Sequence, residues 1–232
     1  MKPGEAPMAE GSAKAGPAPS AVGEEALRKA EEYVEEEEGA ASHFRGRTEA
    51  LLTAAAVAMS LFHLYAAWSV VPAQILRAIH VGFVLFLCFL LFPAARRFRD
   101  RIQWFDVALS LLGVATIAYL LLDFDEFIER AVTPTRWDLV SGVVLMLLVL
   151  EATRRTSGWI LTLVVVAFVA YAFAGPLLPP PWTHRGYDVE RLVGQLYMTL
   201  EGIFGTPIDV SATFIILFTI YGAVLQYSGA GE

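Results

Sequence analysis

The stretch LLTAAAVAMSLFHLYAAWSVVPAQILRAIHVGFVLFLCFLLF, at residues 51–92, decides the fold of this chain. It holds two apolar runs, at 51–71 and 75–92, on either side of Pro72. A run of about 18 apolar residues is long enough to cross the hydrocarbon core of a bilayer. Neither run alternates strictly between polar and apolar residues, which indicates helices rather than barrel strands. The stretch therefore predicts a pair of membrane-spanning helices.

The rest of the chain repeats this pattern. Of its 232 residues, 56% are hydrophobic and 18% are charged. Further apolar runs lie at 104–122, 137–153, 159–178 and 210–227. The run at 189–204 is less apolar and carries Arg191 and Glu201, which favours an interfacial or re-entrant helix. The predicted fold class is all-α: a polytopic transmembrane helix bundle of about six spans plus this one interfacial or re-entrant helix.

The long stretch 137–175 and the N-terminal residues 1–46 differ from the simple pattern of single spans. One straight helix over residues 137–175 would be about 58 Å long, twice the hydrocarbon thickness. We therefore expect two helices that meet in the polar stretch 151–158, which ends in Gly158. Residues 1–46 hold most of the acidic excess behind the net charge of −7, and we expect a disordered tail with a short acidic helix at 24–38. The charge also argues against a nucleic-acid partner.

The arginines and lysines predict the orientation. With the N-terminus in the cytoplasm, 12 of the 17 basic residues fall on the cytoplasmic side and 5 on the other. Cytoplasmic loops carry such an excess of basic residues. The five tryptophans fall at or beyond the predicted span ends, where amphipathic rings prefer to lie. We expect a multi-pass protein of the plasma membrane with a cytoplasmic N-terminus.

Two histidines fall within predicted spans. His63 lies in the first span and His80 near the outer start of the second, at similar depths. Ionisable residues inside a membrane are candidates for function. One interpretation is a redox protein in which His63 and His80 hold a haem. The other is a neutral histidine bonded to a neighbouring helix.

Charged residues cluster at the predicted cytoplasmic span ends. Asp106 lies just inside the third span, and Glu151 precedes Arg154 and Arg155 by three and four residues, which places opposite charges on one helical face. This predicts either a local ion pair that fixes the helix end or a clamp to a neighbouring domain. The sequence holds no catalytic constellation, phosphate-binding loop or Cys/His metal spacing. We expect no enzyme, no catalytic residue and no metal site.

Several stretches together resemble one family. They are Arg77-Ala-Ile-His80, LEATRR at 150–155 followed by Gly158, YAFAG at 171–175, GIFGTP at 202–207, and VSA at 210–212 through SGAG at 228–231. In this order they are similar to the N-terminal region of fused permeases of TRAP transporters, of the TAXI-associated type. The resemblance covers residues from about 33 to the C-terminus.

The resemblance implies that two parts of the chain have different roles. Residues 47–180 are similar to the small, Q-type membrane subunit, and residues 181–232 to a linker, an interfacial helix and the first span of the large, M-type transport domain. Such permeases import organic anions, often carboxylates, with sodium ions, and a periplasmic TAXI-type binding protein delivers the substrate. The hairpins that bind ion and substrate would lie downstream of Glu232, so the chain is expected to be incomplete on its own.

The expected function is thus the membrane scaffold of a sodium-coupled importer. Its partners would be the lipid bilayer, the remainder of the transport domain and the periplasmic binding protein. Candidate structural or interface residues are His80, Asp106, Glu151, Arg154, Arg155, Gly202, Gly205 and Pro207. The alternatives are the haem protein and a membrane-anchored interaction protein whose acidic tail recruits a cytosolic partner.

Overall fold

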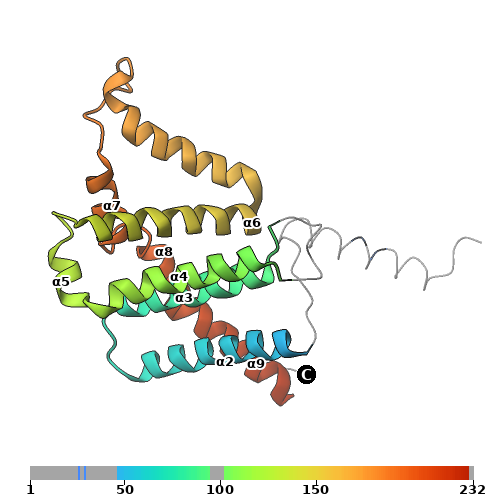
Figure 1. The fold of residues 1–232 in the computed structure, drawn as a ribbon. Helices are drawn as coiled ribbons and strands as arrows, with labels where there is room; N and C mark the ends of the chain where they lie inside the picture. Colours follow the sequence, from blue (N-terminus) through green and yellow to red (C-terminus); the bar gives the residue numbers. More distant parts are fainter. Residues whose placement is uncertain (1–25, 27–28, 30–45, 95–101, 230–232) are drawn as a thin grey trace, which may run out of the picture. The chain divides into compact units, whose positions relative to one another are not determined.

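A computed structural model describes residues 26, 29, 46–94 and 102–229 (Figure 1). The chain divides into two compact units, Met1–Glu37 and Glu38–Glu232. Ala26 and Lys29 represent the first unit and are helical. The predictions of a disordered tail and of an acidic helix at 24–38 otherwise lie outside the described residues. The second unit consists of helices joined by loops and turns, and its described ranges contain no strand.

Three long helices open this unit. They are α2 (Arg47–Trp68), α3 (Ala73–Leu91) and α4 (Trp104–Leu122). Pro72 directly precedes α3, where its missing N–H costs no helical hydrogen bond. At the start of α4 the backbone N–H of Gln103 donates to Asp106 Oδ2 at 3.4 Å. Helices α3 and α4 pack closely side by side along most of their lengths (Figure 1).

The core of the bundle forms where α3 and α4 meet α6. Val81, Leu85 and Phe89 come from α3, and Ile117 and Leu120 from α4. Leu145 and Leu148 of α6 (Arg136–Ala174) complete this layer. The short helix α5 (Phe124–Glu129) contributes the fully buried Phe127. The core residues recur at helical spacing, which is the pattern expected for one buried stripe per helix.

Helix α6 is two helical pieces joined at one glycine. Gly158 has φ of 79° and ψ of −173°, outside the helical region, and the helix changes direction there (Figure 1). The predicted turn at Gly158 is confirmed. The first helix extends further than the apolar run 137–153 indicated, because residues 154–157 remain helical. The described residues hence give five candidate spans rather than six, since Arg136–Leu177 counts as one.

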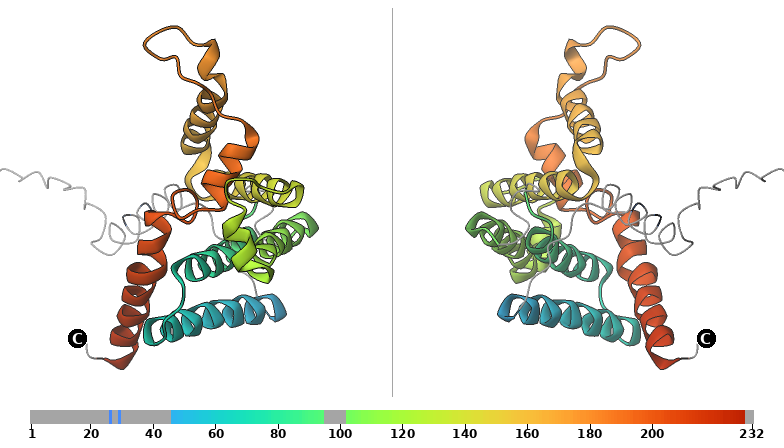
Figure 2. Two further views of the ribbon diagram at one scale, coloured as in Figure 1. Left: turned by 90° about the vertical axis from the view of Figure 1, so that its left-hand side faces the viewer. Right: turned by 90° about the vertical axis from the view of Figure 1, so that its right-hand side faces the viewer.

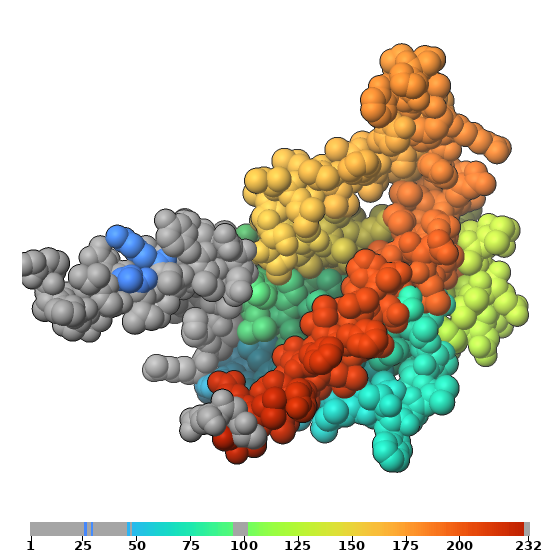
Figure 3. All heavy atoms as spheres, turned by 180° about the vertical axis from the view of Figure 1, so that it is seen from behind, coloured from blue at the N-terminus to red at the C-terminus, as the bar shows by residue number. Residues whose placement is uncertain are grey.

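The last part of the chain runs outward from α6 and then back. After the short turn η2 (Gly175–Leu177) come α7 (Val189–Tyr197), α8 (Thr206–Val210), the π-helical turn η3 (Ser211–Ile215) and α9 (Ile216–Ser228). The predicted helix over 189–204 ends earlier, at Tyr197, because residues 198–205 form turns. The final span, Thr206–Ser228, packs beside α2 (Figure 2) and lies across α3 (Figure 3).

The surface of this unit exposes more large apolar side chains than a water-soluble protein does. Ile160 is 83% exposed and Phe218 is 69% exposed, and large apolar side chains also face outward from α2 and α4. Soluble monomers rarely carry contiguous apolar patches of this extent. All five tryptophans are exposed, and each lies at a helix end, beside the bend at Gly158 or in a loop. These features match helices whose solvent is lipid, with amphipathic rings at its boundary.

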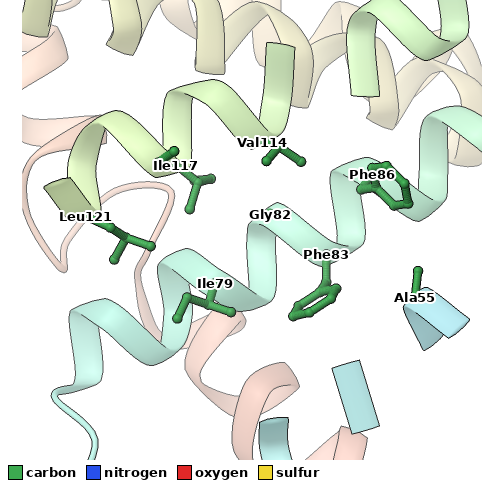
Figure 4. A pocket seen from close by; sticks show the side chains of 9 residues that line it. Ala55, Ile79, Gly82, Phe83, Phe86, Val114, Ile117 and Leu121 are labelled. Carbon is green, nitrogen blue, oxygen red and sulfur yellow. The ribbon is translucent and has the colours of Figure 1, made fainter. Parts of the chain in front are cut away.

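An apolar groove of 340 Å³ opens between α2, α3 and α4 (Figure 4). Its lining consists of apolar residues and one glycine: Ala55, Ile79, Gly82, Phe83, Phe86, Val114, Ile117, Ala118 and Leu121. A charged solute would find no side-chain partner in it. We therefore look for function elsewhere in the bundle.

The bend in α6 leads to a first prediction. Gly158 has open space around its Cα, so Gly158→Ala adds no clash and only forces alanine into a backbone region that glycine alone adopts easily. We expect a loss of about 1–3 kcal/mol in unfolding free energy, measured by thermal denaturation in detergent.

The matched control for this prediction is Gly222→Ala. Gly222 lies inside α9, has no atom within 4 Å of an added Cβ, and has helical geometry. Alanine there is expected to be neutral or mildly stabilising. Equal denaturation midpoints for the two variants would contradict the strain assigned to Gly158.

Candidate functional site

One face of α3 bonds to the segment that leads into the last span. Gln74 Nε2 donates to the Met198 carbonyl at 3.1 Å. Three residues later, Arg77 Nη1 donates to the Phe204 carbonyl at 2.9 Å, and its Nε donates to Asp209 Oδ1 at 3.0 Å. Side chains three apart share a helical face. We call these contacts, together with those of His80, the α3 seam.

His80 continues the α3 seam inward and links three elements. Its Nδ1 lies 2.9 Å from His63 Nε2 on α2, and its Nε2 lies 3.1 Å from Ser211 Oγ. His63 Nδ1 lies 2.7 Å from the Met59 carbonyl, which can only accept, so this nitrogen carries a proton. Two neutral histidines then satisfy the chain: Ser211 donates to His80, His80 to His63, and His63 to Met59.

This geometry does not fit a haem held between the two histidines. Each metal–nitrogen bond is about 2.0 Å, so a shared metal would separate the two nitrogens by about 4 Å. The facing nitrogens are 2.9 Å apart and the rings meet edge to face, with centroids 5.0 Å apart. Both ring nitrogens of each histidine are already engaged. The alternative of histidines bonded to neighbouring helices is the one that the structure shows.

Gly202 and Gly205 shape the turn at the outer end of the α3 seam. Ile203 N–H donates to the Leu196 carbonyl at 2.8 Å, which draws Gly202 against the backbone of α7. A Cβ on Gly202 would overlap that Leu196 backbone, and a Cβ on Gly205 would lie 2.8 Å from the Gly202 carbonyl. The glycines are therefore needed for close approach of two chain segments.

Phe204 and Pro207 anchor the same turn on either side of Gly205. The Phe204 side chain is fully buried in the core. Pro207 lies in the first turn of α8, a position where the missing N–H costs no hydrogen bond. The GIFGTP stretch thus works as a packed corner rather than as a binding loop.

Helix α7 docks on α4 and α6 through Tyr197. Its hydroxyl donates to the Thr116 carbonyl at 2.9 Å and lies 2.9 Å from Ser141 Oγ. Burial raises the pKa of Tyr197, so the hydroxyl remains a donor. Gly142 makes room for this contact, because a Cβ there would lie 2.5 Å from Val193 Cγ1. The amphipathic helix predicted at this place is packed onto the bundle.

A charged cluster lies at the opposite end of the bundle. Arg155 Nη1 is 2.7 Å from Asp106 Oδ1, and these side chains are 1% and 4% exposed. Arg155 Nε also donates to Glu151 Oε1 at 2.8 Å. Glu151 in turn accepts two hydrogen bonds of 2.7 Å from Arg154. The predicted local pairing of Glu151 with both arginines is present, and the link to Asp106 joins α6 to α4.

Arg155 also caps α3, and Arg154 bonds the chain just beyond the helix end. Arg155 Nη1 donates to the Phe92 carbonyl at 3.0 Å, and Arg154 donates from both terminal nitrogens to the Ala94 carbonyl at 3.3 Å. The last carbonyls of a helix lack intrahelical partners, and α3 has no basic residue in its own last turn. Cations from α6 supply both the hydrogen bonds and the favourable charge.

A second buried carboxylate stabilises the start of α6. Asp138 is fully buried and accepts from Tyr119 Oη at 2.8 Å, from Arg130 Nε at 3.2 Å and from the Thr135 backbone N–H at 2.8 Å. The hydrogen bond to Asp138 raises the pKa of Arg130. The spacing of Thr135 and Asp138 is that of a capping box, a signal present in the sequence.

The structure thus places the candidate residues in two groups. Asp106, Glu151, Arg154 and Arg155 meet in the charged cluster, whereas His80, Gly202, Gly205 and Pro207 belong to the α3 seam and its corner. Sequence reasoning missed Gln74, Arg77, Asp209 and Ser211 as members of the seam. The available signal was the three-residue spacing of Gln74, Arg77 and His80 on α3. Within the described residues no group of His, Cys, Asp or Glu is arranged to hold a metal.

Comparison with known proteins bears on the second half of this arrangement. Residues 144–232 match the family model of the tripartite ATP-independent periplasmic transporter, DctM component. No curated protein and no solved structure matches the chain. The matched residues include both arginines of the cluster and the partners of α3 in the seam other than His63, which are Met198, Phe204, Asp209 and Ser211.

The match supports a membrane component of a TRAP transporter. It indicates a transport protein rather than an enzyme, with a periplasmic binding protein as its partner. Together with the apolar helices it indicates a multi-pass protein of the inner membrane. The proposed division at residue 180 stays a prediction.

The charged cluster generates a prediction for Arg155. Arg155→Met leaves Asp106 buried without a cation and the α3 carbonyls without a donor. We expect a loss of about 3–5 kcal/mol in unfolding free energy, measured by thermal denaturation in detergent. The double variant Asp106→Asn/Arg155→Met should lose less than the sum of the two single variants, because the orphaned charge is gone.

The control for Arg155 is its neighbour. Arg154→Met removes an equal charge from a side chain that is 20% exposed, so we expect a distinctly smaller loss. If both variants melted at the same temperature, the buried pair with Asp106 would not be the stabilising contact.

The corner at residues 202–207 gives a local prediction. In Gly202→Ala the new Cβ meets the Leu196 backbone, and we expect a loss of about 1–3 kcal/mol from overpacking. Amides of residues 189–211 should then exchange hydrogen faster in detergent, while those of α4 stay protected. Unchanged exchange over 189–211 would show that the corner tolerates a side chain, and Gly222→Ala provides the reference.

Proposed function

We propose that this chain is the scaffold part of a sodium-coupled, TAXI-type TRAP importer of organic anions, with carboxylates as the substrate class. The observation that carries the proposal is the α3 seam. It joins α3, which lies before the matched range, to residues 198–211, which lie inside it. The seam therefore connects a brace to the beginning of a transport domain.

The α3 seam suits a brace because its groups have few alternatives. Polar groups without partners are costly in a bilayer, since no water is present to bond them. Arg77 bonds both a backbone carbonyl and the Asp209 carboxylate, which fixes depth and rotation together. The final span then starts at a set position relative to α3. A moving transport domain needs such a fixed reference.

The charged cluster supports the same function from the other end. Arg155 holds the end of α3 and α4 against the first half of α6, and Arg154 holds Ala94 just beyond α3. Helices that are tied at both ends form a body that resists deformation. We place this end in the cytoplasm, with the N-terminus, because the basic residues of the sequence are concentrated on that side.

The sodium ions and the substrate are assigned to the transport domain and to no described residue. Residues 47–180 would be the brace, and residues 181–232 would begin the transport domain. A TAXI-type binding protein would deliver the anion to the periplasmic face.

The test is assembly followed by transport. The full chain would be co-expressed with the DctM-type transport domain and the TAXI-type binding protein of the same genome, purified by a tag on the chain, and placed in proteoliposomes. We expect co-purification and uptake of a labelled organic anion that requires an inward sodium gradient. The seam variant Arg77→Gln should still assemble but lose most uptake, because the final span is no longer held.

Arg136→Gln is the matched control, since this exposed arginine starts α6 away from the seam. It should keep wild-type uptake. Failure of the chain to associate with the transport domain in detergent and in nanodiscs would remove the scaffold proposal. Equal uptake under a potassium gradient would remove sodium coupling alone.

A further inference from the structure

A cavity of 420 Å³ lies at the outer end of α6, apart from the seam and the charged cluster. It is formed where the chain leaves the last turns of α6 and folds back towards α7. Its lining combines aromatic rings with two arginines: Tyr171, Ala172, His184, Arg185, Gly186, Tyr187 and Arg191. Neither the family match nor the scaffold function assigns a role to it.

The loop around this cavity is held in place by His184. His184 Nε2 lies 3.0 Å from the Tyr171 carbonyl, and its Nδ1 accepts from the Gly186 N–H at 3.1 Å. The carbonyl can only accept, so the proton is on Nε2 and the ring is neutral. The ring lies against Gly175, whose carbonyl also accepts from the His184 N–H at 3.2 Å. These hydrogen bonds fix the loop, and with it the shape of the cavity, without a ligand.

The two arginines at this cavity are not neutralised. Among the described residues, no acidic side chain pairs with Arg185 or Arg191, whereas Arg77, Arg130 and Arg155 all have carboxylate partners. Asp188, the acid nearest in sequence to Arg185, accepts from the Arg191 backbone N–H at 2.8 Å, and Glu190, next to Arg191, makes no ion pair with it among the described residues. Two guanidinium groups on one rigid cavity favour an anion with several oxygens, such as a phosphate.

The surroundings place the cavity at the edge of the lipid. Tyr171 and Ala172 belong to the candidate span Arg136–Leu177, and Trp182 beside them is 66% exposed. Trp and Tyr concentrate where the hydrocarbon meets the headgroups. Below the cavity the second half of α6 exposes apolar side chains such as Phe168. A ligand that fits all of this has a phosphate on one end and an apolar remainder on the other.

We propose that this cavity binds the headgroup of an anionic phospholipid, with its phosphate between Arg185 and Arg191 and its acyl chains along the second half of α6. An acidic segment of a soluble protein would satisfy the arginines but not the apolar wall that continues from them. The lipid would hold the outer end of α6 at headgroup depth. This site is independent of the scaffold function.

The test is lipid binding to the full chain in detergent, followed by native mass spectrometry. The delipidated protein is titrated with phosphatidylglycerol and, separately, with phosphatidylcholine, which carries a phosphate but no net charge. We expect tighter binding of phosphatidylglycerol. Each arginine near a lipid surface strengthens binding about fivefold, so in Arg185→Gln/Arg191→Gln this binding should weaken about twenty-five-fold.

Two further variants keep the result decisive. Arg136→Gln removes one exposed charge elsewhere and should leave phosphatidylglycerol binding unchanged. Arg185→Lys/Arg191→Lys keeps the charge but not the fork of donors, and binding should be intermediate. Wild-type binding by the double glutamine variant, or equal binding of both lipids, would overturn the proposal. Displacement of phosphatidylglycerol by soluble polyglutamate at physiological salt would also overturn it and would assign the cavity to an acidic protein segment.

Discussion

The bonds of Arg155 are the constraint on which much of the bundle depends. One guanidinium meets the carboxylates of Asp106 and Glu151 and the carbonyl of Phe92, and so joins α6, α4 and the end of α3. A buried charge is tolerated only when its partners are complete, since desolvation is costly and each missing bond adds to the cost. The three helices cannot slide along one another without leaving a charge or a helix end unsatisfied. Their shared register is therefore fixed at this point, and the apolar core of α3, α4 and α6 packs within it.

The α3 seam works in the same way at the other end of the bundle, with fewer charged groups and more neutral ones. Gln74, Arg77 and His80 meet backbone carbonyls, a carboxylate and a hydroxyl in turn. Each contact is ordinary, but their order along one helix face gives a single alignment of α3 with residues 198–211. The apolar helices supply the affinity for lipid, and the sparse polar groups select one arrangement among many that lipid would allow. A scaffold for a transporter needs that selection more than it needs additional stability.

Apolar run length predicted much of this fold because lipid restricts the choices. Backbone groups in a bilayer must bond within a helix, so runs such as 104–122 translate almost directly into α4. The bend at Gly158 was also predictable, since one straight helix would be far too long. The apolar run ends near residue 153, so the continuation of the helix to residue 157 was missed, although spacing placed Glu151, Arg154 and Arg155 on one helical face. Their partners on α3 and α4 are distant in sequence, and those partners allow charged residues to stay helical.

The site was harder to predict for a related reason. The pairing of Glu151 with Arg154 and Arg155 follows from spacing along one helix, but the meeting of Arg155 with Asp106 depends on how α4 and α6 pack. His63 and His80 were recognised as neighbours, yet their separation of 2.9 Å and the hydroxyl of Ser211 decide between a metal and a hydrogen-bond chain. Gly202 gave no local signal that Leu196 lies against it. Periodicity shows which residues share a face and leaves open what that face touches.

The π-helical turn Ser211–Ile215 has a consequence for everything that follows it in the chain. A π-turn closes its hydrogen bonds one residue later than an α-helix, so it accommodates an extra residue without lengthening the path in proportion. Each residue of an α-helix turns the chain by about 100°. Five residues of a π-helix turn the chain by about as much as four residues of an α-helix, so loss of one residue at this turn would close it into an ordinary α-helical turn and leave the faces of α9 where they are. Loss of a residue within α9, for example just before Tyr221, would instead turn every later face by about 100°, so the surplus residue beside Ser211 makes this turn more tolerant of a deletion than the helix that follows it.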